Sequence, residues 1–210
     1  LGRDLHDVIV QLNPTLEDGY LRRIEEAAEP LLKTVSRKDI RYTFTVLNSN
    51  TVNAFSHPGG FIYVSRGLFN MVGEDEDYAL EYVLGHEIAH VDLKHALKCL
   101  QDEGVKKVPW GTIQKLYGLI IPAAFLDEQE YEADAWIFRR MRTLGRTNRE
   151  CLAFLNKLEG YAKIHGFENG RAKPNPNSSI IDNHVPAQTA AYKRLKRLKE
   201  LRDQASTPPK

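Results

Sequence analysis

Cysteine is scarce in this chain, and its scarcity excludes a fold held together by several disulfides. Only Cys99 and Cys151 occur in 210 residues, and neither belongs to a Cys-x-x-Cys pair or shows a metal-ligand spacing. We therefore expect two free, buried thiols.

A chain of this length suits a single domain with a substantial core. We predict one domain over residues 1–210, with a flexible loop or lid at 166–183 and a tail at 204–210.

A strong net charge and a long apolar run are also missing. The 29 Lys and Arg residues balance 28 Asp and Glu, so no overall field would recruit nucleic acid. No apolar run reaches about 18 residues, the length expected of a membrane span. The most apolar stretch, 116–126, is short and is interrupted by Gly118 and Pro122. We therefore expect neither nucleic-acid binding nor a membrane span, and composition sets neither the compartment nor the oligomeric state.

The sequence does contain one distinctive motif, His86-Glu87-Ile88-Ala89-His90. Because His86 and His90 are four residues apart, a helix would place both imidazoles on one face, one turn apart. They would then share one zinc ion, with Glu87 directed at the metal-bound water as general base. The chain has seven His, so the alternative is two ordinary histidines on a helix. Apolar periodicity and flanking residues predict a helix over 75–103 that carries the motif mid-way.

A catalytic zinc takes three protein ligands and keeps one position for water, so a third ligand is needed. His95 lies about 900° around the helix from His86, so we expect it to face away, at the surface or behind a ligand. Glu130 is the better candidate, because it heads a second predicted helix with Asp134 one turn later on the same apolar stripe. Buried acids need partners: zinc for Glu130 and the N–H of a ligand histidine for Asp134. The alternative is that both acids simply favour the first turns of a solvated helix.

Together these motifs resemble a known family. His86-Glu87-x-x-His90 followed by Glu130-x-x-Ala133-Asp134 resembles the gluzincin pattern of the CAAX prenyl protease and HtpX-like zinc metallopeptidases. Segment 53–68, Asn-Ala-Phe-Ser-His-Pro-Gly-Gly-Phe-Ile-Tyr-Val-Ser-Arg-Gly-Leu, is similar to that family's stretch before the active-site helix. The three segments follow the family's order over roughly residues 40–140. One departure is Leu126-Asp127, where the family often has Ser-Arg.

The resemblance implies an α+β, zincin-like fold, mostly helical, with a small, mainly antiparallel sheet beside the active-site helix. It implies one Zn²⁺ per chain, bound by His86, His90 and Glu130, and an endopeptidase that cleaves unfolded or exposed polypeptide segments. It also favours a location in the cell envelope. We interpret one strand as the sheet edge that pairs with the substrate backbone; its residues are Phe61, Ile62, Tyr63 and Val64.

His184 is the candidate for a further catalytic group. It follows the 166–183 loop in His184-Val185-Pro186, which is similar to the family's late His-Pro segment, and it would donate to the oxyanion. Two alternatives are a fourth zinc ligand that keeps the enzyme latent and a surface histidine. The family also has an Arg about six residues after this histidine. Ala190 stands at that position here, and Arg194 is four residues further on.

Two other functions would fit the same motifs. One is a latent or non-catalytic, chaperone-like or interaction module in protein quality control that keeps its zinc, and the other is a zinc hydrolase of non-peptide substrates, such as an amidase. Glu87 favours an enzyme, because a structural zinc site needs no general base and leaves no open coordination position.

The predicted helix 187–203 has a basic face that would suit an acidic partner or anionic lipid. A core-packed helix with a solvated basic face is the favoured alternative.

Local patterns predict the remaining elements. We expect an extended segment over 1–14 and an amphipathic helix over 16–35. Thr147 and Glu150 predict a capping box at the start of a later helix. Three strands are expected, over 40–47, 52–55 and 61–65.

Overall fold

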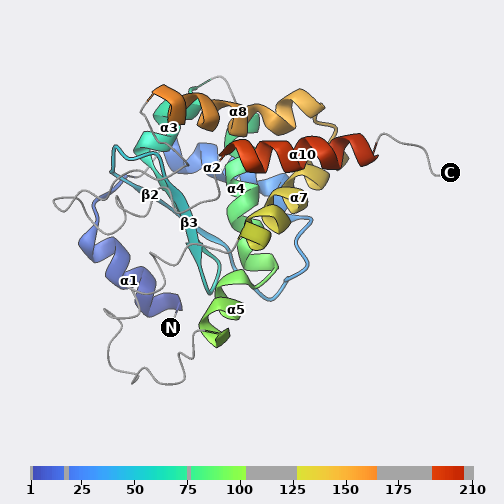
Figure 1. Ribbon diagram of the computed structural model, residues 1–210. Helices are drawn as coiled ribbons and strands as arrows, with labels where there is room; N and C mark the ends of the chain where they lie inside the picture. Colours follow the sequence, from blue (N-terminus) through green and yellow to red (C-terminus); the bar gives the residue numbers. More distant parts are fainter. Residues whose placement is uncertain (1, 17–18, 75–76, 103–126, 165–190, 206–210) are drawn as a thin grey trace.

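One helix, α4 (Asp77–Asp92), lies at the centre of the structure and is covered on all sides (Figure 1). Every residue from Ala79 to Asp92 is buried. A helix buried all round is usually apolar all round, so the His and Glu residues of α4 need partners inside the protein. The elements packed on α4 include α2 (Gly19–Leu32), α7 (Asp127–Thr143), α8 (Asn148–Ile164) and β3 (Ala54–His57).

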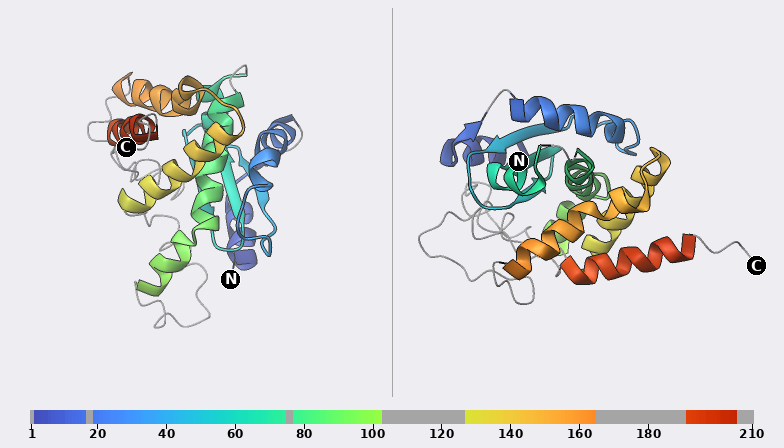
Figure 2. Two further views of the ribbon diagram at one scale, coloured as in Figure 1. Left: turned by 90° about the vertical axis from the view of Figure 1, so that its right-hand side faces the viewer. Right: turned by 90° about the horizontal axis from the view of Figure 1, so that it is seen from above.

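The computed structural model describes residues 2–16, 19–74, 77–102, 127–164 and 191–205. The predicted α+β class, mostly helical with a small sheet, is confirmed. Figure 2 shows the sheet on one side of α4, with α7, α8 and α10 on the other. The remaining described elements are α1 (Gly2–Leu12), β1 (Thr15–Leu16), β2 (Thr43–Leu47), β4 (Phe61–Ser65), α3 (Arg66–Val72), α5 (His95–Asp102) and α10 (Ala191–Ala205).

The sheet has four strands in the order β1-β2-β4-β3. Its outer pairings, β1 with β2 and β3 with β4, are antiparallel, whereas β2 and β4 run parallel with Thr43 opposite Phe61. The prediction that Phe61, Ile62, Tyr63 and Val64 form a sheet edge is therefore wrong. The chain turns back at Pro58-Gly59-Gly60, and β2 occupies the other side of β4, so the edge strand next to α4 is β3.

Two predicted elements differ from the structure. Residues 2–12 form a helix instead of an extended segment, and Leu5 and Ile9, one turn apart, are buried on one face of it. The long helix predicted over 75–103 is broken after Asp92, because Lys94 adopts a left-handed conformation with φ of 62°. The chain changes direction there, and α5 begins at His95.

The predictions for Thr147, Glu150 and Cys151 are confirmed. Thr147 and Glu150 form the capping box, with the Thr147 N–H 2.6 Å from Glu150 Oε2 and the Glu150 N–H 3.3 Å from Thr147 Oγ1. Cys151 is free and buried, and burial raises the pKa of its thiol to about 11. Within the described ranges, no helix combines the length and apolar character needed to cross a bilayer.

Candidate metal centre

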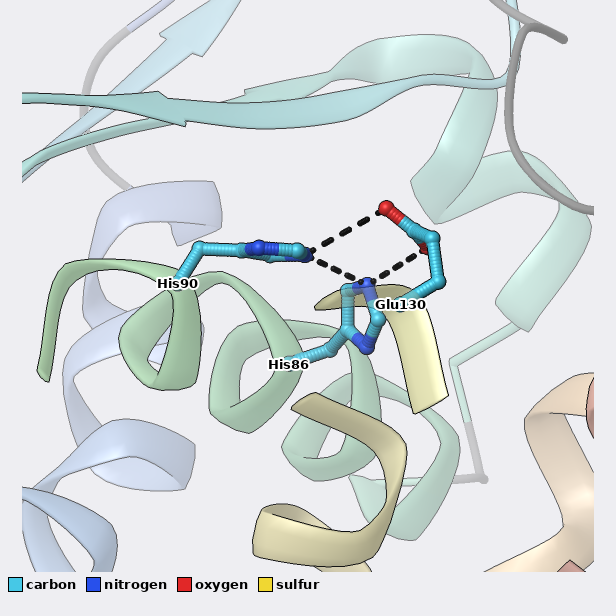
Figure 3. Close-up of side chains that lie close together, drawn as sticks. All are labelled: His86, His90 and Glu130. Atoms are coloured by element: carbon cyan, nitrogen blue, oxygen red, sulfur yellow. Dashed lines mark hydrogen bonds and ion pairs between the residues drawn. The ribbon is translucent and has the colours of Figure 1, made fainter. Parts of the chain in front are cut away.

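The two motif histidines converge on a third side chain from a neighbouring helix. His86 and His90 lie one turn apart on α4, and Glu130 lies in the first turn of α7 (Figure 3). The Nε2 atoms of His86 and His90 are 3.0 Å apart. Glu130 places Oε2 3.2 Å from His86 Nε2 and Oε1 3.5 Å from His90 Nε2. All three side chains are buried, so the sequence-predicted ligands form one enclosed cluster.

The spacing of these atoms fits a shared zinc ion. Two ligand atoms about 2.1 Å from a tetrahedral ion lie about 3.4 Å from each other, and the observed separations of 3.0–3.5 Å are close to that value. The donor set, two imidazoles and one carboxylate, is one that zinc takes in catalytic sites. Among the described residues, the group of side chains placed to hold a metal ion consists of His86, His90 and Glu130.

The surroundings of Glu130 give a second, independent indication of a bound metal ion. Its Oε2 atom is buried and makes no hydrogen bond with any described residue, although His86 Nε2 and Arg194 Nη1 lie 3.2 and 3.4 Å away. A buried carboxylate oxygen that has only these longer ion pairs and no hydrogen bond is incompletely compensated for its loss of water. A metal ion bound to this oxygen would provide the missing compensation.

Asp134 lies directly behind His86. Its Oδ1 atom is 3.0 Å from His86 Nδ1 and also accepts a hydrogen bond of 2.7 Å from the Tyr82 hydroxyl. Arg194 of α10 donates to both carboxylate oxygens, at 2.6 and 2.8 Å. A carboxylate behind a ligand histidine fixes which ring nitrogen carries the proton and leaves Nε2 available for the metal. The sequence predicted this pairing, without the contribution of Arg194.

The charges of this cluster shift the pKa values of its members. Burial and Arg194 oppose protonation of His86, but Glu130 and Asp134 outweigh them and raise the pKa of His86 to about 9. Burial, together with the nearby positive charges, holds the pKa of His90 well below its usual value. Burial opposes ionisation of Asp134, but Arg194 outweighs it and keeps the pKa of that carboxyl well below the usual range. In the metal-free chain His86 is therefore protonated and Asp134 ionised at neutral pH.

His95 does not face away from the site, and of its two predicted positions, at the surface or behind a ligand, it takes the second. It is completely buried, and its Nδ1 atom lies 2.9 Å from His90 Nδ1. One continuous helix over 75–103 would have placed it opposite His86. The break at Lys94 turns the start of α5 back towards His90, which brings His95 behind that ligand.

Glu87 lies between the two histidines in sequence and faces β3. Its Oε2 atom accepts a hydrogen bond of 2.9 Å from the Ser56 hydroxyl, and its side chain is buried. Burial raises the pKa of Glu87, while His86 and Ser56 partly oppose that shift. A carboxyl group whose pKa is raised towards neutrality can accept and return a proton at the pH where it works.

Most of the chain matches the sequence pattern of a known peptidase family. The sequence pattern of peptidase family M48 matches residues 18–202. The chain belongs to peptidase family M48. The candidate metal centre of this M48 chain lies inside the matched region.

Several proteins similar in sequence to this M48 chain are named as proteases. Metalloprotease LoiP of Escherichia coli (strain K12) is 26% identical over 180 residues, which cover 79% of this chain and 65% of LoiP. Metalloprotease YcaL of the same organism is 25% identical over 187 residues, covering 82% of this chain and 67% of YcaL. A putative beta-barrel assembly-enhancing protease of Vibrio cholerae is 27% identical over 111 residues, covering 52% of this chain but 22% of that protein. The chain thus spans less than two thirds of LoiP and less than a quarter of the Vibrio protein. The narrower resemblance to CAAX prenyl and HtpX-like proteases stays a prediction.

The remaining sequence-predicted residues of the M48 chain have different outcomes. His184 and the 166–183 loop lie outside the described residues. His57 is buried in β3, where its Nε2 lies 2.9 Å from the Tyr63 hydroxyl. The basic face of α10 is exposed at Lys193, Lys196, Arg197 and Lys199, as the core-packed alternative predicted, while Leu195 and Leu198 are buried.

Two residues of the site, Arg194 and Ser56, were not assigned to it from the sequence. Arg194 lies 60 residues from Asp134, and Ser56 lies 31 residues from Glu87. The sequence offered one signal for Arg194, the family's Arg about six residues after His184, but Arg194 lies four residues beyond that position. Ser56 left none, because a single serine in a strand is common on any sheet.

Proposed function

We propose that this chain is a zinc-dependent endopeptidase that hydrolyses peptide bonds in unfolded or exposed polypeptide segments. The observation that carries the proposal is the convergence of His86, His90 and Glu130 around a buried carboxylate oxygen that lacks a hydrogen bond. Glu87 adds a buried, ionisable carboxyl next to this cluster. Family membership supports a metallopeptidase, and the names of LoiP and YcaL describe metalloproteases.

When bound, zinc would polarise the scissile carbonyl and lower the pKa of a water molecule towards about 7. His86, His90 and Glu130 would hold it, with Asp134 fixing the orientation of His86. Glu87 would accept a proton from the attacking water and deliver it to the leaving amine. Ser56 would hold the Glu87 carboxylate in place through its hydrogen bond.

An extended substrate would pair with β3, the edge strand beside α4, in place of the strand predicted from sequence. β3 contains Ser56, so a backbone aligned along it would pass close to Glu87. Pairing through the backbone tolerates many side chains, which suits cleavage of unfolded segments. Glu87 also favours a peptidase over a zinc-bound interaction module, because such a module needs no general base.

The test is cleavage of an unfolded protein such as casein, analysed by mass spectrometry. Zinc-loaded protein should produce defined fragments. Glu87→Gln should reduce cleavage at least about 100-fold, the lower end of the usual contribution of a general base, while keeping one zinc per chain. Cleavage that survives the substitution would contradict the role of Glu87. Zinc binding without any cleavage by the unaltered protein would favour the latent or non-catalytic alternative.

A further inference from the structure

The two candidate ligand histidines are held from behind by different groups. His86 Nδ1 faces the carboxylate of Asp134 directly, at 3.0 Å. His90 Nδ1 faces another imidazole, the Nδ1 atom of His95, at 2.9 Å. His95 in turn places Nε2 3.0 Å from Glu132 Oε2. His90 is therefore connected to a carboxylate through one intervening ring.

The direction of these hydrogen bonds follows from metal binding. If His90 Nε2 binds a metal, that atom carries no proton, so the proton of the neutral ring is on Nδ1. His90 Nδ1–H then donates to His95 Nδ1, which must be unprotonated. The proton of His95 is consequently on Nε2, where it donates to Glu132 Oε2. One arrangement of protons satisfies both hydrogen bonds, from His90 to His95 and from His95 to Glu132. It is the arrangement that leaves His90 Nε2 unprotonated and facing Glu130.

The two supports also differ in their access to solvent. The Asp134 side chain is 2% exposed and is held by Arg194 and Tyr82. His95 is completely buried, whereas the Glu132 side chain is 56% exposed. Glu132 lines a pocket of about 510 Å³ bordered by α7, α10 and Lys98 of α5. The chain of hydrogen bonds thus runs from a buried ligand to a carboxylate that solvent reaches.

We propose that His95 and Glu132 are positioning residues for the metal centre: together they select the Nδ1–H form of His90 and fix its ring towards the metal. The inference rests on the proposed metal site formed by His86, His90 and Glu130. It gives the site two supports of different kinds, a buried carboxylate for one histidine and a histidine–glutamate pair for the other. Loss of either member of the pair should weaken metal binding without removing a ligand.

The first test measures zinc affinity by competition with a chelator. His95→Phe should weaken binding about 10–100-fold, the usual effect of losing a group behind a ligand. In His95→Asn the amide oxygen can occupy the place of Nδ1 and accept from His90, so this variant should recover most of the lost affinity. A loss of folding would be read from circular dichroism of the metal-free protein.

Glu132→Ala provides a variant that does not disturb the core, because its side chain is half exposed. Glu128→Ala is the matched control, since Glu128 is one turn earlier on α7 and lines the same pocket. A zinc dissociation constant more than about threefold higher in Glu132→Ala than in Glu128→Ala supports the proposal, given the range expected for such groups. A smaller difference overturns it.

The second test reads the proton positions directly. Long-range ¹H–¹⁵N spectra of the zinc-loaded protein should show His90 protonated at Nδ1 and His95 at Nε2. His95 protonated at Nδ1 would overturn the proposal, because that ring could not accept from His90. Failure of the unaltered protein to bind zinc would instead contradict the proposed metal site, so the two failures are distinguishable.

Discussion

Arg194 is almost completely buried, and its charge is balanced by carboxylates from another helix. It donates to both oxygens of Asp134, at 2.6 and 2.8 Å, and places Nη1 3.4 Å from Glu130 Oε2. Desolvation disfavours the charged guanidinium, but Asp134 and Glu130 outweigh it and raise the pKa of Arg194. This residue therefore connects α10 to the group that orients His86.

Arg194→Met should destabilise the protein strongly. Removing one partner of a buried ion pair leaves an uncompensated charge, here on Asp134, and costs about 3–5 kcal/mol. Arg197→Met is the matched control on α10, because Arg197 is exposed and its pair with Glu200 contributes about 0–1 kcal/mol. Urea unfolding of the metal-free proteins measures both effects. Similar stabilities for the two variants would contradict this role for Arg194.

Zinc binding at neutral pH should release a proton from His86. Its pKa in the metal-free fold is raised to about 9 from the usual 6.5, so the ring is charged at pH 7 and must become neutral to bind the metal. The pKa of His90 is lowered, so that ring is already neutral. Calorimetry in buffers of different ionisation enthalpy should show about one proton released from His86 per zinc at pH 7, in addition to the proton lost by the ionised fraction of zinc-bound water.

The same shift predicts how the stability of the metal-free protein depends on pH. Because the pKa of His86 is raised on folding, its stabilising contribution is fully present below pH 6.5 and is lost as pH rises through about 9. The part of the proton release that comes from His86 should therefore fall above that pH. Zinc binding at pH 7 without any proton release would contradict the predicted charge of His86.

At the scale of elements, the candidate site depends on how closely α4 approaches α7. Gly85 precedes His86 and allows this contact. A methyl group at position 85 would collide with Ile137 Cδ1, and it would lie 2.6 Å from Ile137 Cγ1 and 3.1 Å from Leu31 Cδ1. Because Ile137 is completely buried, it has little room to move away. The small residue therefore sets the distance between the two helices that supply the ligands.

Gly85→Ala should weaken zinc binding although no ligand is changed. The added methyl should force the helices apart or repack Ile137, at a cost of about 1–3 kcal/mol that the better helix propensity of Ala only partly offsets. Adding Ile137→Ala removes both colliding atoms and should restore part of the zinc affinity. A single variant that binds zinc as tightly as the unaltered protein would show that the helices need not be so close.

The elements also show what the sequence could predict. Residues within one helix have fixed spacing, so the common face of His86 and His90 and the capping box of Thr147 and Glu150 followed from local geometry. The position of β4 inside the sheet could not be predicted in this way. It depends on β2, a strand distant in sequence, pairing with the side of β4 that β3 leaves open. The break at Lys94 was also hidden, because Lys carries no strong preference for the left-handed conformation found there.

At the scale of the whole molecule, the candidate metal centre joins parts that are distant in sequence. α4, α7 and α10 meet at His86, Glu130, Asp134 and Arg194, while β3 contributes Ser56 to Glu87. The charged residues of the motif could be predicted because their spacing in the sequence marks them. Arg194 and Ser56 could not, because only long-range contacts bring them to the site. A metal ion at this junction would bind the folded chain and not the unfolded one, and would therefore stabilise the whole arrangement.

The most direct test is a crystal structure of the zinc-loaded protein with anomalous diffraction at the zinc edge. We expect one zinc ion per chain, with His86 Nε2, His90 Nε2 and a Glu130 carboxylate oxygen as its protein ligands at about 2.0–2.2 Å. Glu87 should lie beside the ion without binding it. A zinc ion held by other residues, or a protein that binds none under conditions where it stays folded, would contradict the central claim.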